Sequence, residues 1–145
     1  MALEKIRSYF VIFSLLLIGS CTPGSATNEE PINHDEIIQE TFERFELEAP
    51  YPPVYIESPN HEFLSGTTVG RAVRYSTGRE EIYLEDHAVR SERSFKELLE
   101  HEVAHLKTWR VHGEGVASHG SEFRNICNQY AQNRKACSES TSRFF

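Results

Sequence analysis

Apolar residues recur at intervals of three and four positions in three separate stretches of the chain. This spacing places them along one face of an α-helix. It predicts an amphipathic helix over residues 33–47, a second from residue 94 to about residue 109 or 111, and a third over residues 121–133. The second helix also carries a start signal, because Ser94 and Glu97 match the capping box with Ser94 as the N-cap.

Between the first two helices the pattern changes to the alternation of apolar and polar residues that is typical of strands. VYIES (residues 54–58), RAVRY (71–75) and EIYL (81–84) are the three candidates. Ser76-Thr77-Gly78 forms a turn signal between the last two of them. We therefore expect an α+β fold with an N-terminal helix, a small antiparallel sheet of about three strands, and two further helices.

The N-terminal residues follow a different pattern, which is typical of a targeting segment. A charged stretch precedes the apolar run from Phe10 to Ile18, and that run is too short to span a bilayer as a helix. The following Ile18-Gly19-Ser20-Cys21 resembles the lipobox of bacterial lipoproteins. That resemblance implies cleavage before Cys21 and acylation of its thiol and its new amino group. The alternatives are an ordinary cleaved signal followed by a chance cysteine, or a signal anchor.

This pattern predicts the domain organisation and the location of the protein. Residues 1–20 would be a lipoprotein signal peptide, residues 21–32 a polar, flexible tether, and residues 33–145 one folded domain. We expect an exported protein that is anchored to the membrane by lipid on Cys21, on the periplasmic or cell-surface side.

Charge narrows the choice of partners. The chain has a formal net charge of −7. Binding to nucleic acid regardless of sequence depends on lysine and arginine neutralising phosphates, so an acidic protein is not expected to bind it. We predict a protein or peptide substrate and no nucleic acid; the sequence does not predict an oligomeric state.

Lipidation of Cys21 would leave Cys127 and Cys137 as a pair. An even pair in an exported domain is a candidate disulfide. The alternative is two reduced, partly buried thiols. Zinc binding by this pair is disfavoured because neither cysteine belongs to a close C-x-x-C motif.

The segment from His101 to His105 has the pattern H-E-x-x-H. On the predicted helix both imidazoles lie on one face, one turn apart, so two nitrogens can reach one zinc ion. Glu102 is rotated by about 100° from His101, which places its carboxylate beside the ion. There it can act as the general base toward the water that zinc activates. We predict Zn²⁺ as the cofactor, with His101 and His105 as ligands and Glu102 as the catalytic base.

A catalytic zinc site needs a third protein ligand and an open fourth position. His112 follows His105 on the same helix, and two further turns would carry it about 10 Å past the ion. His119 follows a glycine-rich loop that can reverse the chain, at the entry to the next helix. Geometry therefore favours His119, and the role of His112 is left open.

H-E-x-x-H followed by a loop and by His119-Gly120-x-Glu122-Phe123 resembles the SprT-like zinc metalloproteases. Gly70-Arg71-Ala72 and the strand EIYLE before the metal helix match the same family in the same order, over roughly residues 33–133. The resemblance implies a zincin-like domain, zinc ligands at His101, His105 and His119, a general base at Glu102, and a packing role for Phe123. No cysteine-rich ribbon follows the last helix, and the acidic, exported character of the chain argues against DNA-bound proteins as substrates.

These observations predict a membrane-tethered zinc metallopeptidase that hydrolyses peptide bonds. Two other classes stay open: a zinc-binding module that recognises a protein or cell-wall partner without turnover, and a zinc amidase that acts on cell-wall peptides. Tyr75, Tyr83 and His112 are candidate donors to the oxyanion of a tetrahedral intermediate, although each is more simply a strand or loop residue.

Overall fold

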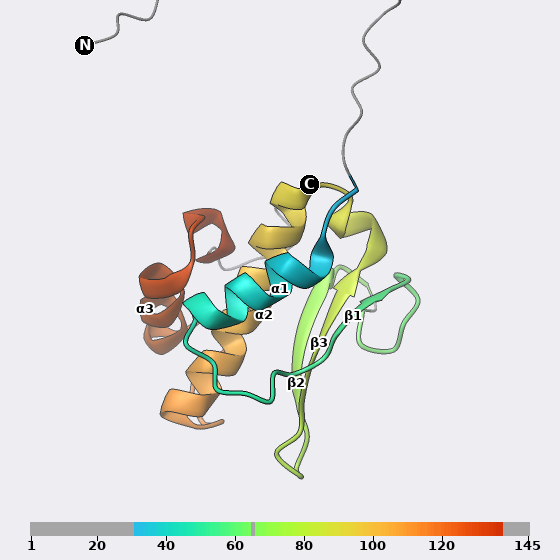
Figure 1. The fold of residues 1–145 in the computed structure, drawn as a ribbon. Helices are drawn as coiled ribbons and strands as arrows, with labels where there is room; N and C mark the ends of the chain where they lie inside the picture. The colour runs from blue at the N-terminus through green and yellow to red at the C-terminus, as the bar shows by residue number, and fades with distance from the viewer. Residues whose placement is uncertain (1–30, 65, 138–145) are drawn as a thin grey trace, which may run out of the picture. The chain divides into compact units, whose positions relative to one another are not determined.

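A computed structural model of the chain describes residues 31–64 and 66–137. The predicted signal peptide, Cys21 and nearly all of the tether lie outside these residues. Among the described residues, no helix combines the length and the apolar composition that crossing a membrane requires. The elements follow one another along the chain as α1 (His34–Arg44), β1 (Val54–Glu57), β2 (Gly70–Arg74), β3 (Glu80–Glu85), η1 (Asp86–Val89), α2 (Glu92–His112), α3 (Ser121–Tyr130) and η2 (Arg134–Cys137) (Figure 1).

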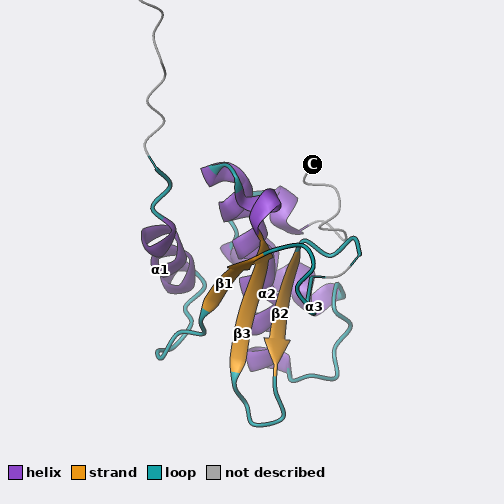
Figure 2. Cartoon of the chain, turned by 90° about the vertical axis from the view of Figure 1, so that its right-hand side faces the viewer, coloured by secondary structure: helices purple, strands orange, loops and turns teal. Residues whose placement is uncertain are grey.

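The expected α+β architecture is confirmed, with three α-helices and a three-stranded sheet in the described part of the chain. The long helix α2 packs against α1, α3 and the sheet, and Figure 2 shows it behind the strands. The predicted helices are present, and their ends differ from the expected positions by a few residues.

The expectation of a wholly antiparallel sheet was wrong. The strand order is β1-β3-β2, with β3 antiparallel to β2 and parallel to β1. The β2–β3 hairpin follows from its local turn, in which Gly78 has a φ of 83° and Tyr75 N–H donates to the Arg79 carbonyl at 2.8 Å. β1 instead pairs directly with β3, which follows β2 in the chain, and no local signal specifies the parallel direction.

The capping box also differs from the expected one. α2 begins earlier, with Ser91 as N-cap, and Ser91 and Ser94 bond reciprocally through their side chains and backbone amides. Glu97 does not reach back to the cap. It is 6% exposed and accepts hydrogen bonds from Arg93 and Asn133 instead.

The core forms where α2 meets the other elements. Its largest fully buried apolar side chains come from both helices and strands, and they include Phe42, Phe45, Ile82, Leu84, Phe95, Leu98, Leu99, Leu106 and Phe123. Because α2 is in contact with neighbours on several sides, the polar residues at its centre are buried as well. That burial sets the chemistry of the site described next.

Candidate metal centre

α2 presents the histidines of the H-E-x-x-H segment to the protein interior. His101 is 1% exposed and His105 is 9% exposed. The two residues lie one helical turn apart, and their Nε2 atoms are 3.1 Å from each other. The helix therefore brings two imidazole nitrogens to one point.

The segment between α2 and α3 brings a third imidazole to the same point. α2 ends at His112, and Gly113 follows it with a φ of 82°, a left-handed conformation that glycine adopts without strain. His119 lies just before α3 with its Nε2 atom 3.1 Å from His101 Nε2, and Arg124 of α3 donates to its carbonyl at 2.8 Å. His101, His105 and His119 form a cluster whose ligand atoms all lie within 4.8 Å of one another. His112 is exposed at the end of the helix and does not belong to this cluster.

One aromatic ring packs against all three imidazoles. Phe123 of α3 is fully buried, and its ring centroid lies 5.1 Å from that of His101, 4.4 Å from His105 and 5.0 Å from His119. The ring limits how far each imidazole can rotate. This is the packing position that the resemblance implied for Phe123.

The hydrogen bond of His101 fixes which of its nitrogens can bind a metal. His101 Nδ1 lies 2.6 Å from the carbonyl oxygen of Ala136. A carbonyl can only accept, so Nδ1 carries the proton and donates it. Nε2 is then the unprotonated nitrogen, and its lone pair points toward His105 and His119.

Three imidazole nitrogens in this arrangement fit a zinc ion. Ligands at about 2.0–2.1 Å from a tetrahedral zinc ion lie about 3.3 Å from one another, close to the spacing in the cluster. Burial lowers the pKa of His101 to about 4 and that of His105 to about 3, so both are neutral near pH 7 and offer lone pairs. Three histidines with an open fourth position form a donor set typical of zinc.

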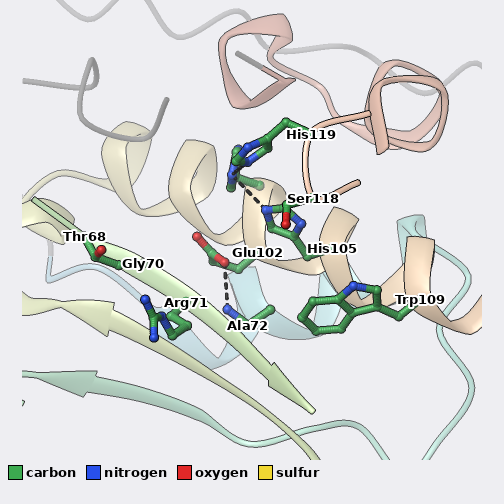
Figure 3. A pocket seen from close by; sticks show the side chains of 10 residues that line it. Thr68, Gly70, Arg71, Ala72, Glu102, His105, Trp109, Ser118 and His119 are labelled. Atoms are coloured by element: carbon green, nitrogen blue, oxygen red, sulfur yellow. Dashed lines mark hydrogen bonds between the residues drawn. The ribbon is translucent and has the colours of Figure 1, made fainter. Parts of the chain in front are cut away.

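Glu102 lies beside the cluster and is almost completely buried, with 2% of its surface exposed. Its Oε2 atom accepts a hydrogen bond from the Ala72 N–H of β2 at 2.8 Å, as Figure 3 shows. Burial raises the pKa of Glu102 to about 8, although the Ala72 hydrogen bond and the charge of Arg71 both favour the ionised form. A carboxyl group with a pKa near neutrality can both take up and release a proton.

A glycine of β2 provides the space that this carboxylate occupies. A Cβ atom at Gly70 would lie 2.6 Å from Glu102 Oε1 and 2.8 Å from Leu98 Cδ1. Neither distance is possible without movement of the neighbour. β2 thus positions Glu102 in two ways: the Ala72 amide donates a hydrogen bond to it, and Gly70 leaves the space that its carboxylate needs.

The histidine cluster and Glu102 open into a pocket of about 280 Å³. Residues 70–72 of β2 and Thr68, just before the strand, form one wall, and Trp109 and Ser118 belong to the remaining lining (Figure 3). The ring of Trp109 stacks on that of His105, with the centroids 6.0 Å apart. The pocket therefore combines three metal-binding nitrogens, a carboxyl group and a strand edge.

The residues suggested as oxyanion donors lie outside the lining of the pocket. The hydroxyls of Tyr75 and Tyr83 both donate to Glu81 Oε2 at 2.7 Å, and neither residue lines the pocket. His112 does not line it either. Three parts of the site were not predicted from the sequence: the Ala72 amide, the space at Gly70 and the Ala136 carbonyl. Only Gly70 left a signal in the sequence, as a glycine that opens a predicted strand.

The model of the SprT-like family matches residues 35–143, which is most of the chain. No curated protein matches, and no solved structure matches.

Proposed function

The chain belongs to the SprT-like family, and from this membership and the histidine cluster we propose that it is a zinc-dependent metallopeptidase. The observation that carries the proposal is the convergence of His101, His105 and His119 beside the buried carboxyl group of Glu102. We assign the three histidines as zinc ligands and Glu102 as the general base.

Zinc bound at the cluster would act as a Lewis acid that makes a water molecule more acidic and polarises the substrate carbonyl. Glu102 would accept the proton of the attacking water and then deliver it to the leaving amine. The Ala72 amide holds Oε2 in place, which leaves Oε1 to exchange the proton. Burial supports this role because a raised pKa makes the carboxylate of Glu102 a stronger base toward the attacking water.

The edge of β2 supports a peptide as the substrate. In the described part of the chain, β2 pairs with β3 on one side only. The Val69 carbonyl accepts from Glu85 N–H, and Tyr75 N–H donates to the Arg79 carbonyl, so the odd-numbered residues of this stretch bond toward β3. Backbone groups alternate along an antiparallel pair, so the carbonyls of Gly70 and Ala72 face the open edge beside the pocket. An extended peptide could pair with that edge while its carbonyl reaches the zinc ion.

Export and lipid anchoring through Cys21 remain predictions from the N-terminal sequence. One feature of the fold supports an oxidising environment: Cys127 of α3 and Cys137 of η2 are joined by a disulfide bond. Disulfides of this kind persist outside the cytosol. We therefore place the proposed peptidase on the exported side of the membrane.

The substitution Glu102→Gln tests the proposal. We expect the variant to keep its zinc, measured by metal analysis, while hydrolysis of a denatured protein substrate falls by about 10²- to 10⁴-fold, the usual contribution of a general base. Glu114→Gln changes an exposed carboxylate in the loop between α2 and α3 and should leave both properties unchanged. Hydrolysis by Glu102→Gln at the wild-type rate would show that Glu102 is not the general base. Wild-type protein that takes up no zinc from a metal-replete solution would contradict the site itself.

A further inference from the structure

The chain after α3 turns back and closes over the centre of α2. Residues 134–137 form the short helix η2, which contacts α2, and Ala136 within it is fully buried. The Ala136 carbonyl is the acceptor for His101 Nδ1 at 2.6 Å, across 35 residues of sequence. A metal-binding histidine is therefore oriented by the backbone of a different segment.

Two anchors hold that segment in place. The first is polar: the buried carboxylate of Glu100 accepts the backbone N–H groups of Gln132 at 3.1 Å and Asn133 at 3.3 Å. The second is covalent, because the disulfide joins Cys127 of α3 to Cys137, the residue next to Ala136. The polar anchor fixes the start of the segment, and the disulfide fixes the end that carries the carbonyl.

The end of the segment depends on the disulfide because η2 has little stability of its own. It is a single turn of 3₁₀-helix, closed by the Ala136 N–H bond to the Asn133 carbonyl at 3.0 Å. Short 3₁₀ turns have poor hydrogen-bond geometry, and isolated turns do not persist in water. Without the link to α3, the Ala136 carbonyl would depend on this single turn, on the packing of Ala136 and on the polar anchor three residues earlier.

Loss of this acceptor would act directly on metal binding. A neutral imidazole carries one proton, which can reside on either nitrogen. The Ala136 carbonyl holds that proton on Nδ1, and Nε2 then faces the other two histidines with a free lone pair. If the carbonyl moves away, the proton can occupy Nε2, and the ring is free to turn. Either change removes a ligand from the cluster.

We propose that the Ala136 carbonyl, held by the Cys127–Cys137 disulfide, is the positioning group of the zinc ligand His101, so that the zinc affinity of the site depends on the intact disulfide. The inference rests on the proposed zinc function and extends it to the regulation of the same site. In an oxidising environment the disulfide is formed and the site is complete. A two-electron reductant that converts the disulfide to two thiols would weaken zinc binding without touching a ligand.

The test compares the oxidised wild-type protein with the double variant Cys127→Ala/Cys137→Ala. Alanine is used because free thiolates are themselves zinc ligands and would obscure the result. Zinc affinity is measured by competition with a chelator of known affinity. We expect the double variant to bind zinc about 10- to 100-fold more weakly, the usual effect of losing a group that orients a ligand.

A second readout detects the orientation of His101 itself. Nitrogen NMR of the zinc-free proteins distinguishes the two neutral tautomers of an imidazole. We expect His101 of the wild type to carry its proton on Nδ1 and His101 of the double variant to populate both tautomers. Addition of a phosphine reductant should reproduce the change in the wild type and have no effect on the double variant.

Ile37→Ala is the matched control for a general loss of stability. It opens a cavity at a buried position of α1 and leaves both the disulfide and η2 intact. We expect it to lower the thermal midpoint while zinc affinity and the His101 tautomer stay as in the wild type. An effect on zinc affinity as large as that of the double variant would assign the disulfide a merely structural role and overturn the proposal.

The remaining outcomes separate this inference from the proposed function. Wild-type protein that binds zinc, together with a double variant of equal affinity, would overturn the role of the disulfide and leave the zinc site standing. Oxidised wild type that binds no zinc would instead contradict the proposed function. If the double variant does not fold, the zinc-free wild type still decides, because a proton on Nε2 of His101 would refute the positioning role of Ala136.

Discussion

At the scale of single residues, the site depends on the absence of a side chain at Gly70. Glu102 and Leu98 both occupy the volume that a Cβ atom would take there, at 2.6 Å and 2.8 Å. Leu98 contributes only the end of an apolar side chain there, whereas the carboxylate of Glu102 is tied to the Ala72 amide. An added methyl group must therefore displace the carboxylate that we assign as the base, while the three histidines are left where they are.

Gly70→Ala should separate catalysis from metal binding. We expect zinc content equal to that of the wild type and hydrolysis lowered by about 100-fold, because a displaced general base loses much of its contribution. Gly115→Ala is the control, since no atom lies within 4 Å of a Cβ at that position and its φ is not left-handed. Metal analysis and a peptidase assay on both variants give the answer. Wild-type rates in Gly70→Ala would show that Glu102 tolerates the displacement or is not the base.

At the scale of the elements, the start of α2 determines how firmly the metal helix is held at its N-terminus. Ser91 Oγ accepts the Ser94 N–H at 3.1 Å, and the Ser94 side chain in turn lies 3.2 Å from Ser91 N. The cap predicted from the sequence used Ser94 and Glu97 in the same motif, displaced by three positions. That prediction was wrong because Glu97 is buried and accepts hydrogen bonds from Asn133 and Arg93, so it does not reach the N-terminus of the helix.

The two serines can be distinguished by their effects on stability. Ser91→Ala should lower the free energy of unfolding by about 1 kcal/mol, the usual cost of removing an N-cap side chain. Ser94→Ala should cost less, because the Ser91 side chain can still accept the Ser94 backbone amide. Urea denaturation followed by circular dichroism measures both. A larger loss in Ser94→Ala than in Ser91→Ala would restore the sequence-based cap.

The elements also show where sequence patterns stop being informative. The helices and the β2–β3 hairpin were predictable because their signals are local: the periodicity of apolar residues and a turn glycine. The parallel pairing of β1 with β3 was not, since Val54 meets Ile82 only after the chain has passed through β2. Strand direction in this sheet is decided by long-range packing, which a short window of sequence does not contain.

At the scale of the whole molecule, the metal ligands were predictable from local sequence signals, whereas the groups that orient them are brought in by long-range packing. His101 and His105 share one helix, so their spacing alone predicted a pair, and the glycine-rich loop suggested the return of His119. The Ala136 carbonyl is a backbone group brought to His101 by the fold, so no side-chain motif marks it. The Cys127–Cys137 pair was a candidate from composition alone, but its position beside that carbonyl becomes visible only in the folded chain.

Because the proposed ligands come from α2 and from the segment before α3, zinc would tie two parts of the molecule together. Binding to the folded state alone stabilises it by mass action, by about 2.7 kcal/mol when free zinc is 100 times its dissociation constant. For a domain of this size that corresponds to a rise in the thermal midpoint on the order of 10 °C. We expect this rise in the thermal midpoint when zinc is added to the metal-free protein, and its reversal by a chelator, both measured by calorimetry.

The two candidate third ligands can be distinguished by the same measurement. His119→Ala should lose most of the rise. His112→Ala should keep it, because the straight course of α2 leaves His112 outside the cluster. Equal losses in the two variants would mean that His112, and not His119 alone, contributes to holding the ion.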